Sequence, residues 1–312
     1  AIRAYVPRMD PKAQVQAAKE TAFAVQHADM AVLAVSGKDR VTWLNGLLTC
    51  DLAKRAPGNA VYGLVVERKG HVLADVVVVV DEPGERLFLV VPVFAVESLR
   101  AHLEHYLVME DAEVVPATGY EVWSVHGPRA ETALEAARAA RGFGGTLDRT
   151  GLGGAMVLAA PDVTREVGAA IAGAATVGDE AGWEALRLER GVPRFGVDFD
   201  DKTYPQEAQL EKVAVSFDKG CYLGQEVVCM LEMRGHVKRK LVPVVLDDGA
   251  PPPRGAPVTD EAGAPVGEVT SAGTSPTLGK PVAMAMVKRA FAEAGKRLVV
   301  AGASGEVVER PA

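Results

Sequence analysis

Residues 187–240 read RLERGVPRFGVDFDDKTYPQEAQLEKVAVSFDKGCYLGQEVVCMLEMRGHVKRK. Near the start, Gly191 and Pro193 end a helical pattern, because glycine favours helix termini and proline cannot continue a helix. Further along, Gly220 and Gly224 flank a cysteine and indicate a tight, exposed loop rather than a core helix. The segment therefore joins the region before residue 187 to the region after residue 240, and the two regions differ in their pattern of apolar and turn-forming residues.

Before this segment, strand and helix patterns alternate. Val72–Val80 is the most strand-like run and is expected to form a hairpin with the strand at 87–91. Asp179 is expected to cap a helix that ends near Gly191. The glycine-rich stretch 142–154 is interpreted as a loop. The other expected strands are 31–35, 61–67, 120–126 and 155–160, and the other expected helices are 96–107 and 130–140.

After this segment, short β-rich runs are separated by glycine and proline. Even spacing of short strands predicts a small antiparallel barrel or sandwich. We place a domain boundary near residue 240, which divides the chain into 1–240 and 241–312. The runs are 241–246, 267–271, 282–287 and 298–299.

Composition narrows the functional class. The net charge of −7 disfavours direct binding to nucleic acid through overall charge. The three cysteines form no CxxC pair, so neither a disulfide framework nor a metal site is expected, and a reducing compartment is favoured. Apolar runs such as Val76–Val80 are too short to span a bilayer, and residues 1–4 show no secretory signal. We therefore expect a cytoplasmic protein with no membrane partner.

The octapeptide KGCYLGQE at 219–226 resembles the K-G-C-Y-x-G-Q-E signature of the YgfZ family. That family includes bacterial tRNA-modification factors and mitochondrial iron–sulfur assembly factors, and it is related to the glycine-cleavage T-protein. The resemblance implies an α+β fold with two interleaved N-terminal subdomains, followed by a C-terminal antiparallel β-barrel. Weaker matches follow the family's order at Gly37 and Asp39, 69–70, 127–130, 187–199, 205–207, 267–271 and 275–276.

The same resemblance implies that the protein binds tetrahydrofolate. A pterin ring presents an amide N–H beside an exocyclic amine, and one carboxylate can accept from both. Glu189 matches the position that holds the pterin in the family; the alternative is a solvated helix glutamate paired with Arg187 or Arg190. The other residues assigned to folate binding come from the signature: Lys219, Gly220, Tyr222, Gly224, Gln225 and Glu226.

Two residues are candidates for catalysis. Asp75 interrupts a strand that is otherwise free of charge, so it must lie at an exposed face, at an edge or in a functional pocket. The resemblance places it near the reactive folate nitrogen; an ordinary outward-facing position is the alternative.

Cys221 is the second candidate, as a nucleophile, a cluster contact or a redox sensor, with Lys219 close enough in sequence to lower its pKa. The alternative is a buried structural cysteine. Where the family commonly has Ala-Arg, this chain has Cys229-Met230.

The resemblance implies a folate-dependent accessory factor for assembly or repair of iron–sulfur enzymes, including those that modify tRNA. Its expected partners are folate and either iron–sulfur proteins or their assembly machinery. Three scattered cysteines do not supply the four thiolates usual for a resident cluster. Two alternatives stay open. The first is an aminomethyltransferase that moves a one-carbon unit from a lipoyl-linked amine to tetrahydrofolate. The second is a non-catalytic interaction scaffold.

Overall fold

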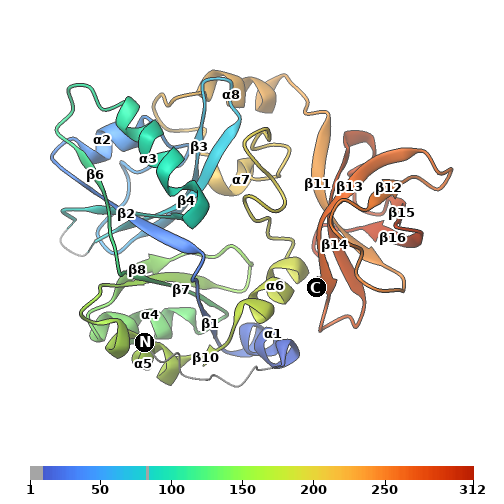
Figure 1. Cartoon of the computed structure of the whole chain (residues 1–312), viewed down its shortest axis with the longest axis horizontal. Helices are drawn as coiled ribbons and strands as arrows, with labels where there is room; N and C mark the ends of the chain where they lie inside the picture. The colour runs from blue at the N-terminus through green and yellow to red at the C-terminus, as the bar shows by residue number, and fades with distance from the viewer. Residues whose placement is uncertain (1–9, 82–83) are drawn as a thin grey trace.

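The computed structural model describes residues 10–81 and 84–312. Figure 1 shows three parts arranged around a centre: two α+β units, one above the other, and a β-barrel to one side. The expected absence of a secretory signal concerns residues 1–4, which lie outside the described residues. No helix among the residues that the structure describes is long and apolar enough to cross a membrane.

The first α+β unit is built on a five-stranded sheet in the order β3-β4-β5-β2-β6. Strand β4 pairs antiparallel with β5, which confirms the expected hairpin. The valines of β4 favour an extended backbone because their branched side chains pack well on a pleated surface. The strands are β2 (Met30–Ser36), β3 (Ala60–Val66), β4 (Val72–Val80), β5 (Leu87–Pro92) and β6 (Glu113–Pro116). The helices of this unit are α2 (Arg40–Asn45), α3 (Val96–His105), α7 (Glu211–Ala214) and α8 (Gln225–Met233), with a 3-10 turn, η1 (Val93–Ala95).

The second unit holds a five-stranded sheet in the order β10-β1-β7-β9-β8. The chain contributes β1 to this sheet, leaves to build the whole first sheet, and returns at β7. This path confirms the two interleaved subdomains that the resemblance implied. The strands are β1 (Phe23–Gln26), β7 (Glu121–His126), β8 (Phe143–Thr146), β9 (Gly154–Ala159) and β10 (Thr176–Val177). The helices are α1 (Pro11–Glu20), α4 (Ala130–Ala139), α5 (Thr164–Ala174) and α6 (Glu180–Glu189).

Strand β8 lies inside the glycine-rich stretch that we interpreted as a loop, so that interpretation was wrong for residues 143–146. These glycines are needed because other backbone segments come very close to the strand, and not because the chain turns there. A Cβ on Gly144 would lie 1.9 Å from the carbonyl oxygen of Met156, and one on Gly145 would lie 2.3 Å from the backbone nitrogen of Ala60. Glycine at 144 lets β8 lie close to β9 of its own sheet, and glycine at 145 lets the second sheet pack against β3 of the first.

The C-terminal part is a closed antiparallel barrel, as expected, in the order β11-β14-β13-β12-β15-β16. Closure removes the free sheet edges that short strands would otherwise expose. The strands are β11 (Arg239–Leu246), β12 (Pro257–Thr259), β13 (Pro265–Thr274), β14 (Pro281–Lys288), β15 (Arg297–Val300) and β16 (Ala303–Val307), with a 3-10 turn, η2 (Arg289–Phe291), after β14.

Helix α6 connects the second unit to the barrel. Asp179 caps it as expected, because its side chain accepts a hydrogen bond from the backbone N–H of Gly182 at 3.1 Å. Leu186 packs with Phe23 of β1, whereas Leu188 packs with Met284 of the barrel. The helix is therefore held between two hydrophobic clusters, and its remaining face turns toward the centre of the molecule.

Candidate functional site

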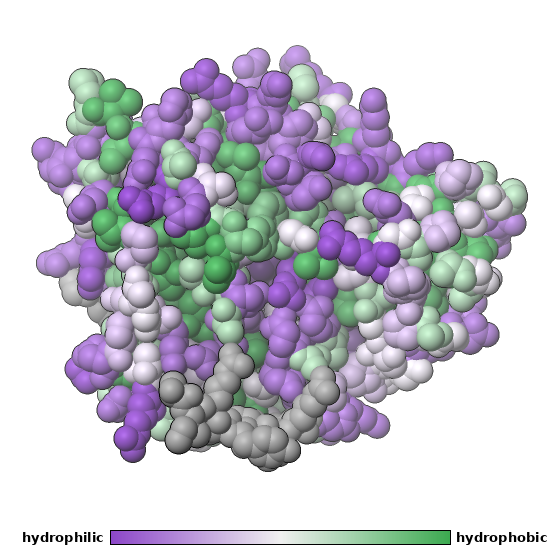
Figure 2. Space-filling view, viewed as in Figure 1, coloured by the Kyte–Doolittle hydropathy of each residue, from purple (hydrophilic) through white to green (hydrophobic). Residues whose placement is uncertain are grey.

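A cavity of about 480 Å³ lies between the two sheets and one face of α6. Its walls are mainly apolar, with β4 and β5 of the first sheet on one side and β7 and β9 of the second on the other. The segment 193–197 completes the wall. In the view of Figure 2 the surface is hollowed near its centre, where apolar side chains border polar ones.

Asp75 of β4 is the buried carboxylate of this cavity. Its side chain lines the wall and is only 7% exposed. Its Oδ2 accepts a hydrogen bond from the hydroxyl of Tyr62 on the neighbouring strand at 3.0 Å. Its Oδ1 is buried and has no hydrogen-bond partner among the described residues. The strand pattern allowed three places for this residue, and the structure puts it in a pocket.

Burial raises the pKa of Asp75 above its ordinary value, although the nearby cation of Arg149 opposes the change. The Arg149 guanidinium lies over the ring of Tyr62, 3.9 Å from its centroid, and donates to the carbonyl of Pro193 at 3.3 Å. Asp75 is therefore a proton acceptor with a held orientation, in surroundings that penalise its charged form.

Two histidines and a serine form a second polar group on the cavity wall. Ser124 Oγ lies 2.7 Å from Nε2 of His27 and 2.9 Å from Nε2 of His126. The ring of His126 stacks on Trp183 with centroids 4.7 Å apart. Burial lowers the pKa of His27 to about 4 and that of His126 to about 3, so both rings are neutral near pH 7.

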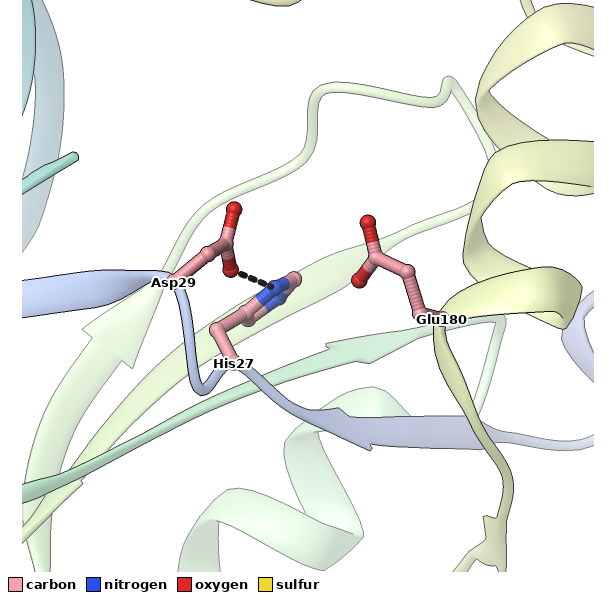
Figure 3. A group of neighbouring side chains, drawn as sticks. All are labelled: His27, Asp29 and Glu180. Carbon is pink, nitrogen blue, oxygen red and sulfur yellow. Dashed lines mark ion pairs between the residues drawn. The ribbon is translucent and has the colours of Figure 1, made fainter. Parts of the chain in front are cut away.

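Acidic side chains gather at the rim of the cavity, where Figure 3 shows His27 and Asp29 facing Glu180 at the start of α6. One ligand atom from each lies within 4.8 Å of the others, which is a spacing that could hold a metal ion. Arg194, however, contacts Asp29 at 2.7 Å and Glu180 at 2.7 Å. A guanidinium thus already balances these carboxylates, and we assign no metal to the group.

The loop that holds the octapeptide 219–226, here called the signature loop, lies away from this cavity. Cys221 is exposed, in agreement with the loop expectation. Gly224 has a φ of 78°, and a Cβ there would lie 2.4 Å from the carbonyl oxygen of Glu67, so only glycine fits. None of the signature residues assigned to folate belongs to the described cavity wall; they are Lys219, Gly220, Tyr222, Gly224, Gln225 and Glu226.

Lys219 anchors this loop instead of facing Cys221. Its ammonium group donates to the carbonyls of Asn45, Leu48 and Cys50 at 2.7, 2.8 and 2.6 Å. Burial lowers its pKa to about 8. The thiol beside it is that of Cys50, which is buried and whose pKa burial raises to about 11. The expected pairing of Lys219 with Cys221 is therefore not the arrangement that the structure shows.

Glu189 also lies outside the cavity wall. Its carboxylate accepts from the Ser275 hydroxyl at 2.6 Å and from the backbone N–H and hydroxyl of Thr277, both at 2.8 Å. Lys19 of α1 approaches it at 3.2 Å. Burial alone would raise its pKa, but these hydrogen bonds and the lysine outweigh it and hold the pKa low. Glu189 joins α6 to the barrel and α1 through these contacts, and its assignment to the pterin stays a prediction.

Sequence reasoning missed most of the polar cavity wall. His27, Tyr62, Ser124, His126 and Arg149 come from four separate parts of the chain. The signal that could have drawn attention to β7 is its alternation. Ser124 and His126 are two residues apart, and therefore share one face of a strand whose other residues are mostly apolar.

Comparison with known proteins agrees with this architecture. A model described as the GCVT N-terminal domain matches residues 8–143, and one described as the glycine cleavage T-protein C-terminal barrel domain matches residues 239–311. The crystal structure of the glycine cleavage system aminomethyltransferase T from Bartonella henselae has a TM-score of 0.82 at 22% identity. The match covers 96% of the present chain and 89% of the Bartonella henselae protein. This likeness shows the fold.

The chain is also similar to curated relatives over most of its length. A probable aminomethyltransferase of Halobacterium salinarum is 30% identical over 321 residues, with 93% of this chain and 85% of the relative covered. The aminomethyltransferase of Saccharopolyspora erythraea is 30% identical, with 87% and 80% covered. That of Nostoc sp. is 29% identical, with 89% and 79% covered. By domain order, fold and sequence, the chain belongs to the glycine-cleavage T-protein (aminomethyltransferase) family.

Proposed function

We propose that the cavity binds a reduced folate and that the protein transfers a one-carbon unit to it, as an aminomethyltransferase. The observation that carries this proposal is Asp75, a buried carboxylate on the wall of a mainly apolar cavity, one of whose oxygens has no hydrogen-bond partner among the described residues. Leaving such an oxygen without a partner costs about 1–3 kcal/mol, so the site favours a ligand that brings a donor. The names of the similar aminomethyltransferases support the reaction class.

The cavity residues fit a reduced folate. Apolar walls suit a ring system, and Trp183 offers an aromatic surface beside them. Asp75 Oδ1 can accept from an N–H of the ring. When bound, tetrahydrofolate supplies the nitrogen that receives the one-carbon unit.

The protein's own contribution is to hold Asp75 in place and to exclude water. Tyr62 fixes one oxygen of the carboxylate, and Arg149 keeps a positive charge nearby. Because burial raises its pKa, Asp75 is better able to take up a proton that leaves the ligand than an exposed aspartate is. Val76 and Met156 face the cavity and keep the site dry.

Calorimetric titration of the reduced protein with tetrahydrofolate tests this proposal. We expect saturable binding to the wild-type protein and a loss of affinity of about tenfold or more in Asp75→Asn. Glu189→Gln is the matched control, because that carboxylate lies outside the cavity, and it should bind like the wild type. Absence of wild-type binding would refute the folate proposal. Loss of binding in Glu189→Gln alone would return the ligand to the site expected from the sequence.

Activity is tested with a lipoylated carrier that bears the aminomethyl group. Formation of methylene-tetrahydrofolate by the wild type, and its loss in Asp75→Asn, would support the transferase. If folate binds but no carrier yields product, the binding proposal stands and the transferase proposal fails.

A second candidate function rests on Cys221. The thiol is exposed on a loop that Lys219 fastens to the first unit, and the octapeptide around it is the feature that resembles YgfZ. This combination favours a tetrahydrofolate-binding accessory factor for iron–sulfur enzymes, including those that modify tRNA, acting in the cytoplasm. Its test is the activity of such client enzymes in cells carrying Cys221→Ser. Reduced client activity with unchanged folate binding would support this role, and unchanged client activity would reject it.

A further inference from the structure

A row of polar side chains runs from the rim of the cavity along its wall on the second sheet. His27 follows β1, and Ser124 and His126 lie on the neighbouring strand β7. From the rim inward, the order is Asp29, His27, Ser124 and His126. The Asp29 Oδ1 lies 3.9 Å from His27 Nδ1, while its Oδ2 is taken up by Arg194. The two hydrogen bonds at Ser124 complete the row.

The direction of the hydrogen bonds in this row follows from the charge at its outer end. A hydroxyl has a single proton to donate, so Ser124 donates to one histidine and accepts from the other. If Ser124 donated to His126, then His27 would donate through Nε2 and point the lone pair of Nδ1 at the Asp29 carboxylate. The opposite direction places an N–H toward that carboxylate and is therefore favoured.

This direction decides which nitrogen of His126 carries the proton. His126 must donate through Nε2 to Ser124, which leaves Nδ1 with a lone pair. Nδ1 is buried and has no hydrogen-bond partner among the described residues. Burial keeps the ring neutral, and the cation of Arg149 adds to this effect while Asp148 opposes it. His126 thus presents a neutral acceptor, and its side chain lines the cavity.

We infer that His126 is a specificity residue of the cavity, whose Nδ1 accepts a hydrogen bond from the ligand, and that Asp29, His27 and Ser124 are positioning residues that fix its tautomer. The identity of the ligand in this inference rests on the proposed function, whereas the tautomer of His126 does not depend on it. Together with Oδ1 of Asp75 on the opposite sheet, Nδ1 of His126 gives the cavity two acceptors that no group within residues 10–81 and 84–312 pairs with. Such a site selects ligands that carry at least two N–H donors, as amino-substituted nitrogen heterocycles do, over ligands that offer only carbonyl or carboxylate oxygens there.

Nitrogen-15 NMR of the ligand-free, histidine-labelled protein tests the tautomer directly. We expect His126 to show a protonated Nε2 and an unprotonated Nδ1, assigned by its disappearance in His126→Phe. In Ser124→Ala we expect this preference to weaken, while Ser124→Thr retains the hydroxyl and should restore it. A wild-type His126 protonated at Nδ1 would overturn the inference, whatever ligand the protein binds.

Binding is tested with tetrahydrofolate as the probe. His126→Phe keeps a ring against Trp183 and removes the Nδ1 acceptor together with the hydrogen bond to Ser124, so we expect about a tenfold rise in Kd. Ser124→Ala removes the same hydrogen bond but keeps the acceptor, so we expect a smaller rise. Equal affinity of His126→Phe and wild type would overturn the specificity role and leave the folate proposal intact. If the wild type does not bind tetrahydrofolate, the folate proposal fails, and the NMR result decides the inference alone: a protonated Nε2 sustains it and a protonated Nδ1 rejects it.

Discussion

Acidification should destabilise the protein through its two buried histidines. In the unfolded chain a histidine has its ordinary pKa of about 6.5, whereas burial lowers the pKa to about 4 for His27 and about 3 for His126 in the fold. Below about pH 6.5 the unfolded state therefore binds protons that the folded state does not. The contribution of the two neutral histidines to the free energy of unfolding is fully present above that pH and is lost as the pH drops.

The size of the effect follows from the difference in bound protons. Between about pH 7.5 and about pH 5, each histidine that stays neutral in the fold reduces the free energy of unfolding by roughly 2 kcal/mol. The pair should then account for roughly 4 kcal/mol, a large part of the stability of an ordinary domain. Asp75 acts in the opposite direction, because its raised pKa makes its charged form unfavourable in the fold.

Urea titrations at the two pH values, followed by circular dichroism, measure this change. His126→Phe should lose about 2 kcal/mol less than the wild type over the same interval, because one of the two titrating groups is gone. Comparing the variant with the wild type cancels the contribution of Asp75 and of the other carboxylates. Equal losses in the two proteins would refute the reasoning that His126 is buried neutral.

Three further predictions concern residues outside the cavity. Lys219→Met leaves three carbonyls without their donor, so it should lower the free energy of unfolding by about 2–4 kcal/mol and speed alkylation of Cys221; unchanged values of both would show that the lysine does not anchor the loop. Glu189→Gln should lower the free energy of unfolding by about 1–3 kcal/mol, and an unaltered urea midpoint would argue against its linking role. Gly145→Ala should cost at least about 3 kcal/mol, whereas Gly173→Ala, which meets nothing within 4 Å, should be neutral or stabilising; similar midpoints for the two would contradict the close-approach explanation.

Much of the fold could be predicted from the sequence because its strands carry a strong local signal. The uninterrupted valines of β4 permit little besides a buried strand, and the evenly spaced runs after residue 240 indicate the barrel. The strand β8 could not be predicted in the same way. Its glycines have no side-chain pattern, and the requirement for Gly145 comes from the backbone of Ala60 in the other sheet, which lies far away in sequence.

The candidate site was only partly predictable. Asp75 stood out because a lone carboxylate in an apolar strand needs a special location, and its neighbours within the strand are enough to show this. Lys219 and Cys221 are two residues apart, but proximity in sequence does not tell where a long side chain ends. His27 and His126 meet only because β1 and β7 are neighbours in a sheet whose strands come from both ends of the interleaved region.

The path of β1 has a consequence for the order in which the protein is made. This strand leaves the ribosome early, but its partner β7 begins only at Glu121. In the interval, the chain supplies every strand of the first sheet, so that sheet can close while β1 still waits unpaired. Joining β1 to β7 afterwards closes a long loop, which is an entropically costly and slow step. During synthesis, the apolar residues of β1 therefore stay exposed until β7 has been made.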